Sequence, residues 1–74
     1  MNRLPLISGK NLVRLLEKCG FYISHIEGSH YYLRHPDGRK TTVPIHRNED
    51  IQRPLLKTIL KQAGIDEAEY LRLR

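Results

Sequence analysis

The segment His35-Pro36-Asp37-Gly38 constrains the fold most, because it demands a tight reversal between two extended segments. A proline presets the first angle of a turn, and a glycine can take the positive φ that a bulged hairpin needs. Residues 30–35 and 39–45, on either side, are rich in aromatic and β-branched side chains, as strands are. The sequence therefore predicts a β-hairpin at the centre of the chain.

A further strand is predicted over residues 21–26, joined to the hairpin by a turn at residues 27–29. Apolar and polar side chains do not separate cleanly along this segment. Phe21, Ile23 and His25 alternate with residues 22, 24 and 26, two of which are also apolar or aromatic. Its pairing register therefore stays open.

A helix is predicted before the strands, beginning after Ser8, a residue type favoured as an N-cap. Gly20 stands in the usual position for a helix stop. Between them, apolar residues recur with the i, i+3, i+4, i+7 spacing of one buried helical face: Leu12, Leu15, Leu16 and Cys19.

Two helices are predicted after the strands. Pro54 suits the first position of the longer one and Gly64 closes it. Asp66 and Glu69 have the spacing of a capping box, which indicates a short final helix. The longer helix carries one apolar face, formed by Leu55, Leu56, Ile59, Leu60 and Ala63.

These elements predict an α+β two-layer sandwich of order α-β-β-β-α with a short C-terminal helix, in one domain over residues 1–74. Helices on one side of a small sheet leave its other face open. A chain of 74 residues buries little surface. We therefore expect no buried cofactor, and any chemistry should take place on an open surface.

Strand alternation predicts which side chains lie on that open face. The aliphatic sets, built around Leu33 in the second strand and Val43 in the third, should face the helices. The opposite sets should then lie on the open face or at its edge: His30, Tyr32 and Arg34 from the second strand, and Thr42, Pro44 and His46 from the third.

The chain is basic, with 13 Lys and Arg against 8 Asp and Glu and a formal net charge of +5. Such a charge favours a polyanionic partner. Cations at four-residue spacing form one row on each long helix. Such rows are often only solvated surface, but two of them in so small a domain favour contact with an RNA backbone. The rows are Lys10, Arg14 and Lys18 on the first helix, and Arg53, Lys57 and Lys61 on the second.

The number and spacing of the cysteine and histidine residues argue against a disulfide bond and against a metal site. Cys19 is the one cysteine, so no internal disulfide can form, which fits a cytoplasmic protein. No cysteine or acidic pair has the spacing of zinc ligands, and His30 and His35 should point to opposite sheet faces. No apolar run is long enough for a signal peptide or a membrane helix, because Pro5 interrupts the first one.

Three segments, in this order and spacing, resemble the HicA-type toxins of bacterial toxin–antitoxin pairs. They are SGKNLVRLLEKCGF, GSHYYLRHPDGRKTTVPIH and LLKTILKQAGI, which are similar to the first helix, central hairpin and second helix of that family. The resemblance implies a fold like that of double-stranded-RNA-binding domains, cleavage of messenger RNA, and neutralisation by a HicB-type antitoxin. It places the catalytic histidine at His30, with Gly28 and Ser29 as motif neighbours. Pro54 and the lead-in His25-Ile26-Glu27 depart from the family pattern, and Glu27 puts a negative charge near the site.

One histidine is enough for a chemistry in which RNA supplies its own nucleophile, the 2′-hydroxyl. An imidazole can act as a base near neutral pH, and cations stabilise the charge that develops on the phosphate. We therefore expect His30 to act as base, or as acid toward the leaving 5′-oxygen, without a metal. His46 is a possible second proton-transfer group, and Tyr32 could stack on an unpaired base. Arg34, Arg39 and Lys40 are candidate phosphate ligands.

Two other functions fit parts of the sequence. A non-catalytic double-stranded-RNA-binding module would use the helix rows and the hairpin to span phosphates by shape. A protein-interaction subunit would use the basic surface to dock an acidic partner. Neither alternative requires the Gly28-Ser29-His30 motif.

Overall fold

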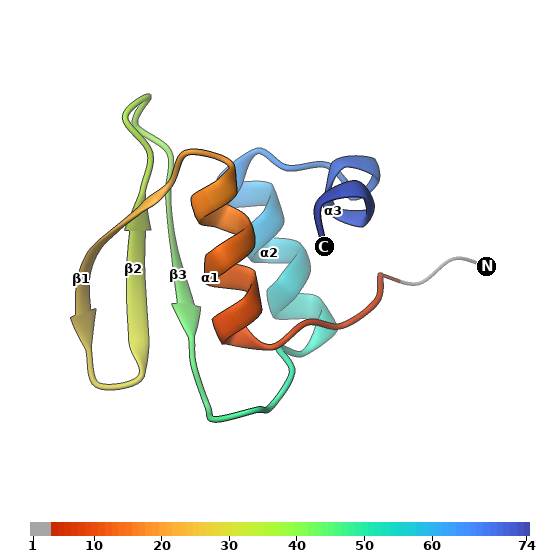
Figure 1. Cartoon of the computed structure of the whole chain (residues 1–74), viewed down its shortest axis with the longest axis horizontal. Helices are drawn as coiled ribbons and strands as arrows, with labels where there is room; N and C mark the ends of the chain where they lie inside the picture. The colour runs from red at the N-terminus through yellow and green to blue at the C-terminus, as the bar shows by residue number, and fades with distance from the viewer. Residues whose placement is uncertain (1–3) are drawn as a thin grey trace.

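In a computed structural model, which describes residues 4–74, the chain forms the predicted α+β sandwich (Figure 1). Residues 1–3 of the expected domain lie outside this range. The elements follow in the order α1 (Gly9–Lys18), β1 (Tyr22–Glu27), β2 (His30–Arg34), β3 (Lys40–Pro44), α2 (Arg53–Ala63) and α3 (Glu67–Leu73). The strand bounds differ from those predicted by about one residue at the ends, where pairing stops. The α-β-β-β-α order is confirmed.

The predicted caps hold the helices in place. The Ser8 hydroxyl accepts a hydrogen bond from the backbone N–H of Asn11, 3.2 Å away, and so caps α1. Gly64 ends α2 in the left-handed conformation, and the Asp66 carboxylate accepts from the N–H of Glu69 at the start of α3. Pro54 is the second residue of α2 rather than the first, because the helix begins at Arg53.

The three strands form an antiparallel sheet in the order β1-β2-β3. In Figure 1 the helices lie beside β3, and β1 is the strand farthest from them. Both α1 and α2 contact β3. The helices therefore leave β1 uncovered, and all six of its residues are exposed.

The core lies between the helices and the covered part of the sheet. Leu12 and Leu16 of α1, Leu33 of β2, Val43 of β3 and Leu56 of α2 are almost completely buried. Leu55 was expected on the same apolar face of α2, but its side chain is 40% exposed. That expectation was wrong because Leu55 lies at the margin of the helix face, beside the buried set of Leu56, Ile59, Leu60 and Ala63.

Helix α3 closes the far side of the helix layer. Tyr70 is completely buried, and its hydroxyl donates a hydrogen bond to the backbone carbonyl oxygen of Pro5. This contact joins two segments that are 65 residues apart in the sequence. Burial raises the pKa of the Tyr70 hydroxyl, so it stays a donor at neutral pH.

We expect Tyr70→Phe to lower the free energy of unfolding by about 1 kcal/mol, since the carbonyl of Pro5 loses its partner while the ring stays packed. Urea unfolding followed by circular dichroism measures this change. Tyr22→Phe is the matched control, because Tyr22 is 50% exposed and should give wild-type stability. Equal stability of the two variants would contradict a structural role for the Tyr70 hydroxyl.

Candidate functional site

The candidate site is built on the face of the sheet that the helices do not cover. Along β2, Leu33 is buried while His30 and Arg34 are exposed, which confirms the predicted alternation. Arg34 pairs with Lys40 of β3, and His30 pairs with Pro44. Two cations and the motif histidine therefore share one open face.

Gly28 and Ser29 form the two-residue turn that places His30 at the start of β2. Gly28 has a φ of +58°, a left-handed conformation that favours glycine. The Ser29 carbonyl accepts a hydrogen bond from the N–H of Ile45, which ties the turn to the chain beyond β3. The motif thus fixes the backbone conformation just before His30.

The structure settles the register of β1, which the sequence left open. Ile23 pairs with Leu33 and His25 pairs with Tyr32, with a bulge between them. Residues directly opposite each other in an antiparallel pair lie on the same face. The bulge at Ser24 therefore moves His25 to the open face, and it places Glu27 opposite His30.

Tyr32 already has a stacking partner. The rings of His25 and Tyr32 are parallel within 7° and their centroids are 4.2 Å apart. The Tyr32 hydroxyl donates to Oε1 of Glu27 over 3.3 Å. One ring face of Tyr32 is thus occupied within the protein itself. The absence of a clear alternation in β1 is why the sequence alone did not place His25 on the open face.

A hollow of about 600 Å³ adjoins this group. It is lined on the sheet by His25, Tyr32, Arg34, Lys40 and Thr42, among others. The hollow is therefore bordered by two cations and by ring edges, which suits a phosphate and its attached nucleoside. His46 is exposed and lies two residues beyond Pro44, outside the lining of this hollow.

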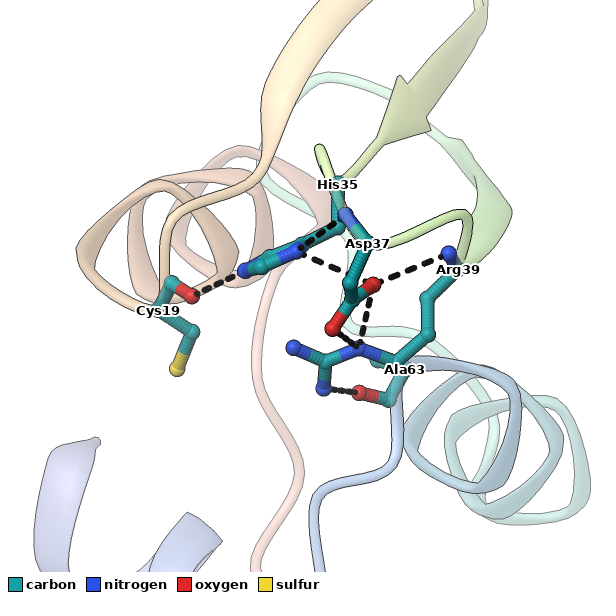
Figure 2. Close-up of polar contacts among 5 residues, drawn as sticks. All are labelled: Cys19, His35, Asp37, Arg39 and Ala63. Carbon is teal, nitrogen blue, oxygen red and sulfur yellow. Dashed lines mark hydrogen bonds and ion pairs between the residues drawn. The ribbon is translucent and has the colours of Figure 1, made fainter.

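The Arg39 side chain does not line this hollow, and it is bonded to other residues of the protein (Figure 2). Its Nε donates to both carboxylate oxygens of Asp37, its NH1 donates to the Ala63 carbonyl, and its guanidinium lies over the Phe21 ring at 5.2 Å from the centroid. These contacts join the β2–β3 turn to the end of α2. We therefore leave Arg39 out of the proposed phosphate ligands.

His35 belongs to the same structural cluster and is partly buried rather than a surface residue. Its Nε2 lies 3.2 Å from the Cys19 carbonyl oxygen, and its Nδ1 lies 3.1 Å from the backbone nitrogen of Asp37 (Figure 2). The ring packs edge-on against Phe21. The same Nδ1 lies 3.0 Å from Oδ1 of Asp37, so the ring contacts both the backbone and the side chain of that residue.

Gly20 makes room for this histidine. A Cβ at this position would lie 2.8 Å from Nε2 of His35, and the residue has a φ of +96°. The nearby thiol of Cys19 points away from the ring (Figure 2). Burial, together with the charge of Glu69, raises the pKa of that thiol, which makes it a poor nucleophile.

The basic helix rows face away from the site. Arg14 and Lys57 belong to helix surfaces opposite or beside the buried faces of α1 and α2, so they lie in the other layer of the sandwich. The Nε of Arg53 donates to the Leu4 carbonyl, so this member of the α2 row has an internal partner. The exposed members of the two rows are Lys10, Arg14, Lys18, Lys57 and Lys61. The structure does not bring them together with His30.

Comparison with known protein families identifies the family of this chain. Residues 9–65, well over half of the chain, match the sequence model of a family described as the HicA toxin of bacterial toxin–antitoxin systems. The chain belongs to the HicA toxin family. As a HicA toxin it is one member of a toxin–antitoxin pairing, and the matched range includes α1, the whole sheet and α2. A search among curated proteins found no significant match.

Two further features of this HicA toxin bear on its chemistry. Within residues 4–74, the structure contains no group of three or more His, Cys, Asp or Glu side chains arranged to hold a metal ion. Among the same residues, no helix is long and apolar enough to cross a membrane.

The Asp37 cluster gives a prediction about pH. The hydrogen bonds from Arg39 hold the pKa of Asp37 below its usual value. A lowered pKa in the folded state contributes stability above the pKa of the unfolded chain, and this contribution is lost as the pH falls through the folded pKa. We expect Asp37→Asn to lower the Tm slightly at pH 7 and to have less effect as the pH approaches 3.

Thermal melts from pH 3 to pH 7 measure this dependence. Glu49→Gln is the matched control, because the Glu49 side chain is exposed and makes no ion pair within residues 4–74. A Tm difference for Asp37→Asn that stays constant across this range would contradict the assignment.

Proposed function

We propose that this HicA toxin is an endoribonuclease that cleaves messenger RNA without a metal, with His30 as the catalytic residue. The observation that carries the proposal is the position of His30. It is exposed at the start of β2, on the face that also carries Arg34 and Lys40, in a chain of a toxin family. An open face of this kind admits a polymer, whereas a closed pocket would not.

The proposed reaction is an internal transesterification. The 2′-hydroxyl attacks the adjacent phosphorus as the imidazole of His30 removes its proton. The bond from phosphorus to the 5′-oxygen breaks and that oxygen takes up a proton, which leaves a 2′,3′-cyclic phosphate and a 5′-hydroxyl. Arg34 and Lys40 would stabilise the negative charge that develops on the phosphate oxygens.

We also propose a HicB-type antitoxin as the protein partner. Coverage of the open face would silence a site of this kind without any change in its conformation. The two cations on the face would meet acidic or polar groups of the partner, and such complementarity speeds association.

We expect His30→Ala to reduce the rate of RNA cleavage by about 10² to 10⁴-fold, because a positioned general base contributes about this much. The fold and RNA affinity should be retained, since the side chain is exposed. The assay uses a long transcript in the presence of EDTA, with product ends identified by mass spectrometry. A 2′-deoxy nucleotide at the mapped site should prevent cleavage there.

Four outcomes would contradict this assignment. Wild-type cleavage by His30→Ala would exclude His30 as the base. Cleavage of the 2′-deoxy substrate would indicate an activated water instead. Binding without any cleavage by the wild type would favour the non-catalytic RNA-binding module, and no RNA affinity at moderate salt would favour the protein-interaction subunit.

The two layers of the sandwich can be tested separately for RNA binding. We expect Arg34→Gln with Lys40→Gln to weaken affinity for single-stranded RNA and to flatten the plot of log K against log salt by about 1.4, at about 0.7 for each lost phosphate contact. Arg14→Gln with Lys18→Gln, and Lys57→Gln with Lys61→Gln, carry the same charge change on the helix layer. Fluorescence anisotropy across a salt series measures all three.

If a helix-layer pair flattens the slope as much as the sheet pair, the rows also contact the RNA backbone. If the sheet pair alone leaves the slope unchanged, Arg34 and Lys40 are not phosphate ligands.

A further inference from the structure

Four polar side chains form a compact block on the open face. The register places His25 opposite Tyr32 and Glu27 opposite His30. His25 and His30 are therefore diagonal neighbours on adjacent strands, a relation that separates backbone positions by about 7–8 Å. Two imidazoles at this separation can reach the two ends of one phosphodiester group.

The ring of His25 is held in place from two sides. Its face stacks on Tyr32, and its Nδ1 lies 3.0 Å from the Ser24 hydroxyl oxygen. The other nitrogen, Nε2, makes no hydrogen bond within residues 4–74. It lies 4.0 Å from Oε2 of Glu27, a distance at which the two groups form an ion pair when the ring is protonated. The geometry thus orients Nε2 and leaves it without a hydrogen-bond partner among the described residues.

We propose that His25 is the general acid of this site and donates its Nε2 proton to the leaving 5′-oxygen while His30 acts as base. This inference rests on the proposed ribonuclease function. The bond from the 2′-oxygen to phosphorus forms and the bond from phosphorus to the 5′-oxygen breaks. His30 gains the 2′-hydroxyl proton and His25 loses one, so the site as a whole neither gains nor loses a proton.

Glu27 and Tyr32 are positioning residues in this arrangement. The Glu27 carboxylate pairs with the protonated form of His25, which is the form that a general acid requires. The Tyr32 hydroxyl, by donating to Oε1, holds that carboxylate toward the ring. Glu27, which departs from the family pattern, thus has a positioning role in this chain.

The hollow beside His25 indicates which side of the scissile phosphate the leaving nucleoside occupies. It extends from His25 to Arg34 and Lys40, and His30 is not among its lining residues. The leaving nucleoside, which carries the 5′-oxygen, would enter the hollow on the side of the scissile phosphate where Arg34 and Lys40 lie. His46 has neither a stacking partner nor a hydrogen bond to orient its ring within residues 4–74, so His25 is the better-placed second histidine.

A substrate with sulfur in place of the leaving 5′-oxygen tests this role, because a thiolate leaves without being protonated. We expect His25→Gln to slow single-turnover cleavage of normal RNA by at least about 10²-fold, and to cleave the sulfur substrate at close to the wild-type rate. His30→Ala should be slow on both substrates. His46→Gln, the matched histidine control, should behave as wild type on both.

The pH profile gives a second measurement. Wild-type cleavage should fall at alkaline pH as the general acid loses its proton, and this fall should be absent in His25→Gln. Tyr32→Phe keeps the ring stack but removes the hydroxyl that holds Glu27. It should cause a partial loss on normal RNA that the sulfur substrate also restores.

The outcomes separate the two proposals. Wild-type rates of His25→Gln on normal RNA, or equal losses on both substrates, would overturn the general-acid role while leaving the ribonuclease intact. Sulfur rescue of His46→Gln, with His25→Gln unaffected, would assign the role to His46 and overturn it as well. Absence of cleavage by the wild type would overturn the ribonuclease function itself, and the His25 role with it.

Discussion

The burial of Leu33 and Val43 against the two long helices is the constraint on which the rest of the structure depends. Side chains on a strand alternate, so burial of these two residues assigns every position of β2 and β3 to one face or the other. A slip of one residue would bring His30 into the core and expose Leu33. The packing that stabilises the fold therefore also selects the residues on the open face.

The cluster at the β2–β3 turn keeps this sheet in a fixed position on the helices. Arg39 joins the turn to the last residue of α2, and His35 joins it to the end of α1. Hydrogen bonds to charged groups contribute more than neutral ones because the ionised partner strengthens the electrostatic attraction. Loss of such a bond would also leave both atoms without a partner in a partly buried place. A small domain has little core to stabilise it, so anchors of this kind matter more here than in a large protein.

The two layers divide the charges of the molecule. The helix layer carries the long basic rows, whereas the sheet carries two cations beside two histidines and a carboxylate. Under the proposed function, the positive field of the whole domain would attract the RNA. The sheet face would then supply the specific contacts.

Local signals in the sequence were sufficient for the helices, the central hairpin and the placement of His30, Tyr32 and Arg34 on the open face. Each of these depends on residues close together in the chain: the cap at Ser8, the turn at Gly38, and the strict alternation around Leu33. The family model matches a range that contains the Gly28-Ser29-His30 motif, and the role of that motif stays a prediction.

Only the tertiary structure decided the register of β1, the anchoring roles of His35 and Arg39, and the position of His25 beside Tyr32. A bulge breaks the period of two, so alternation alone could not assign the residues on either side of it. The anchors join side chains to backbone carbonyls 16 and 24 residues away. Contacts of that length are made by the packing of whole elements, and the sequence carries no local pattern that could indicate them.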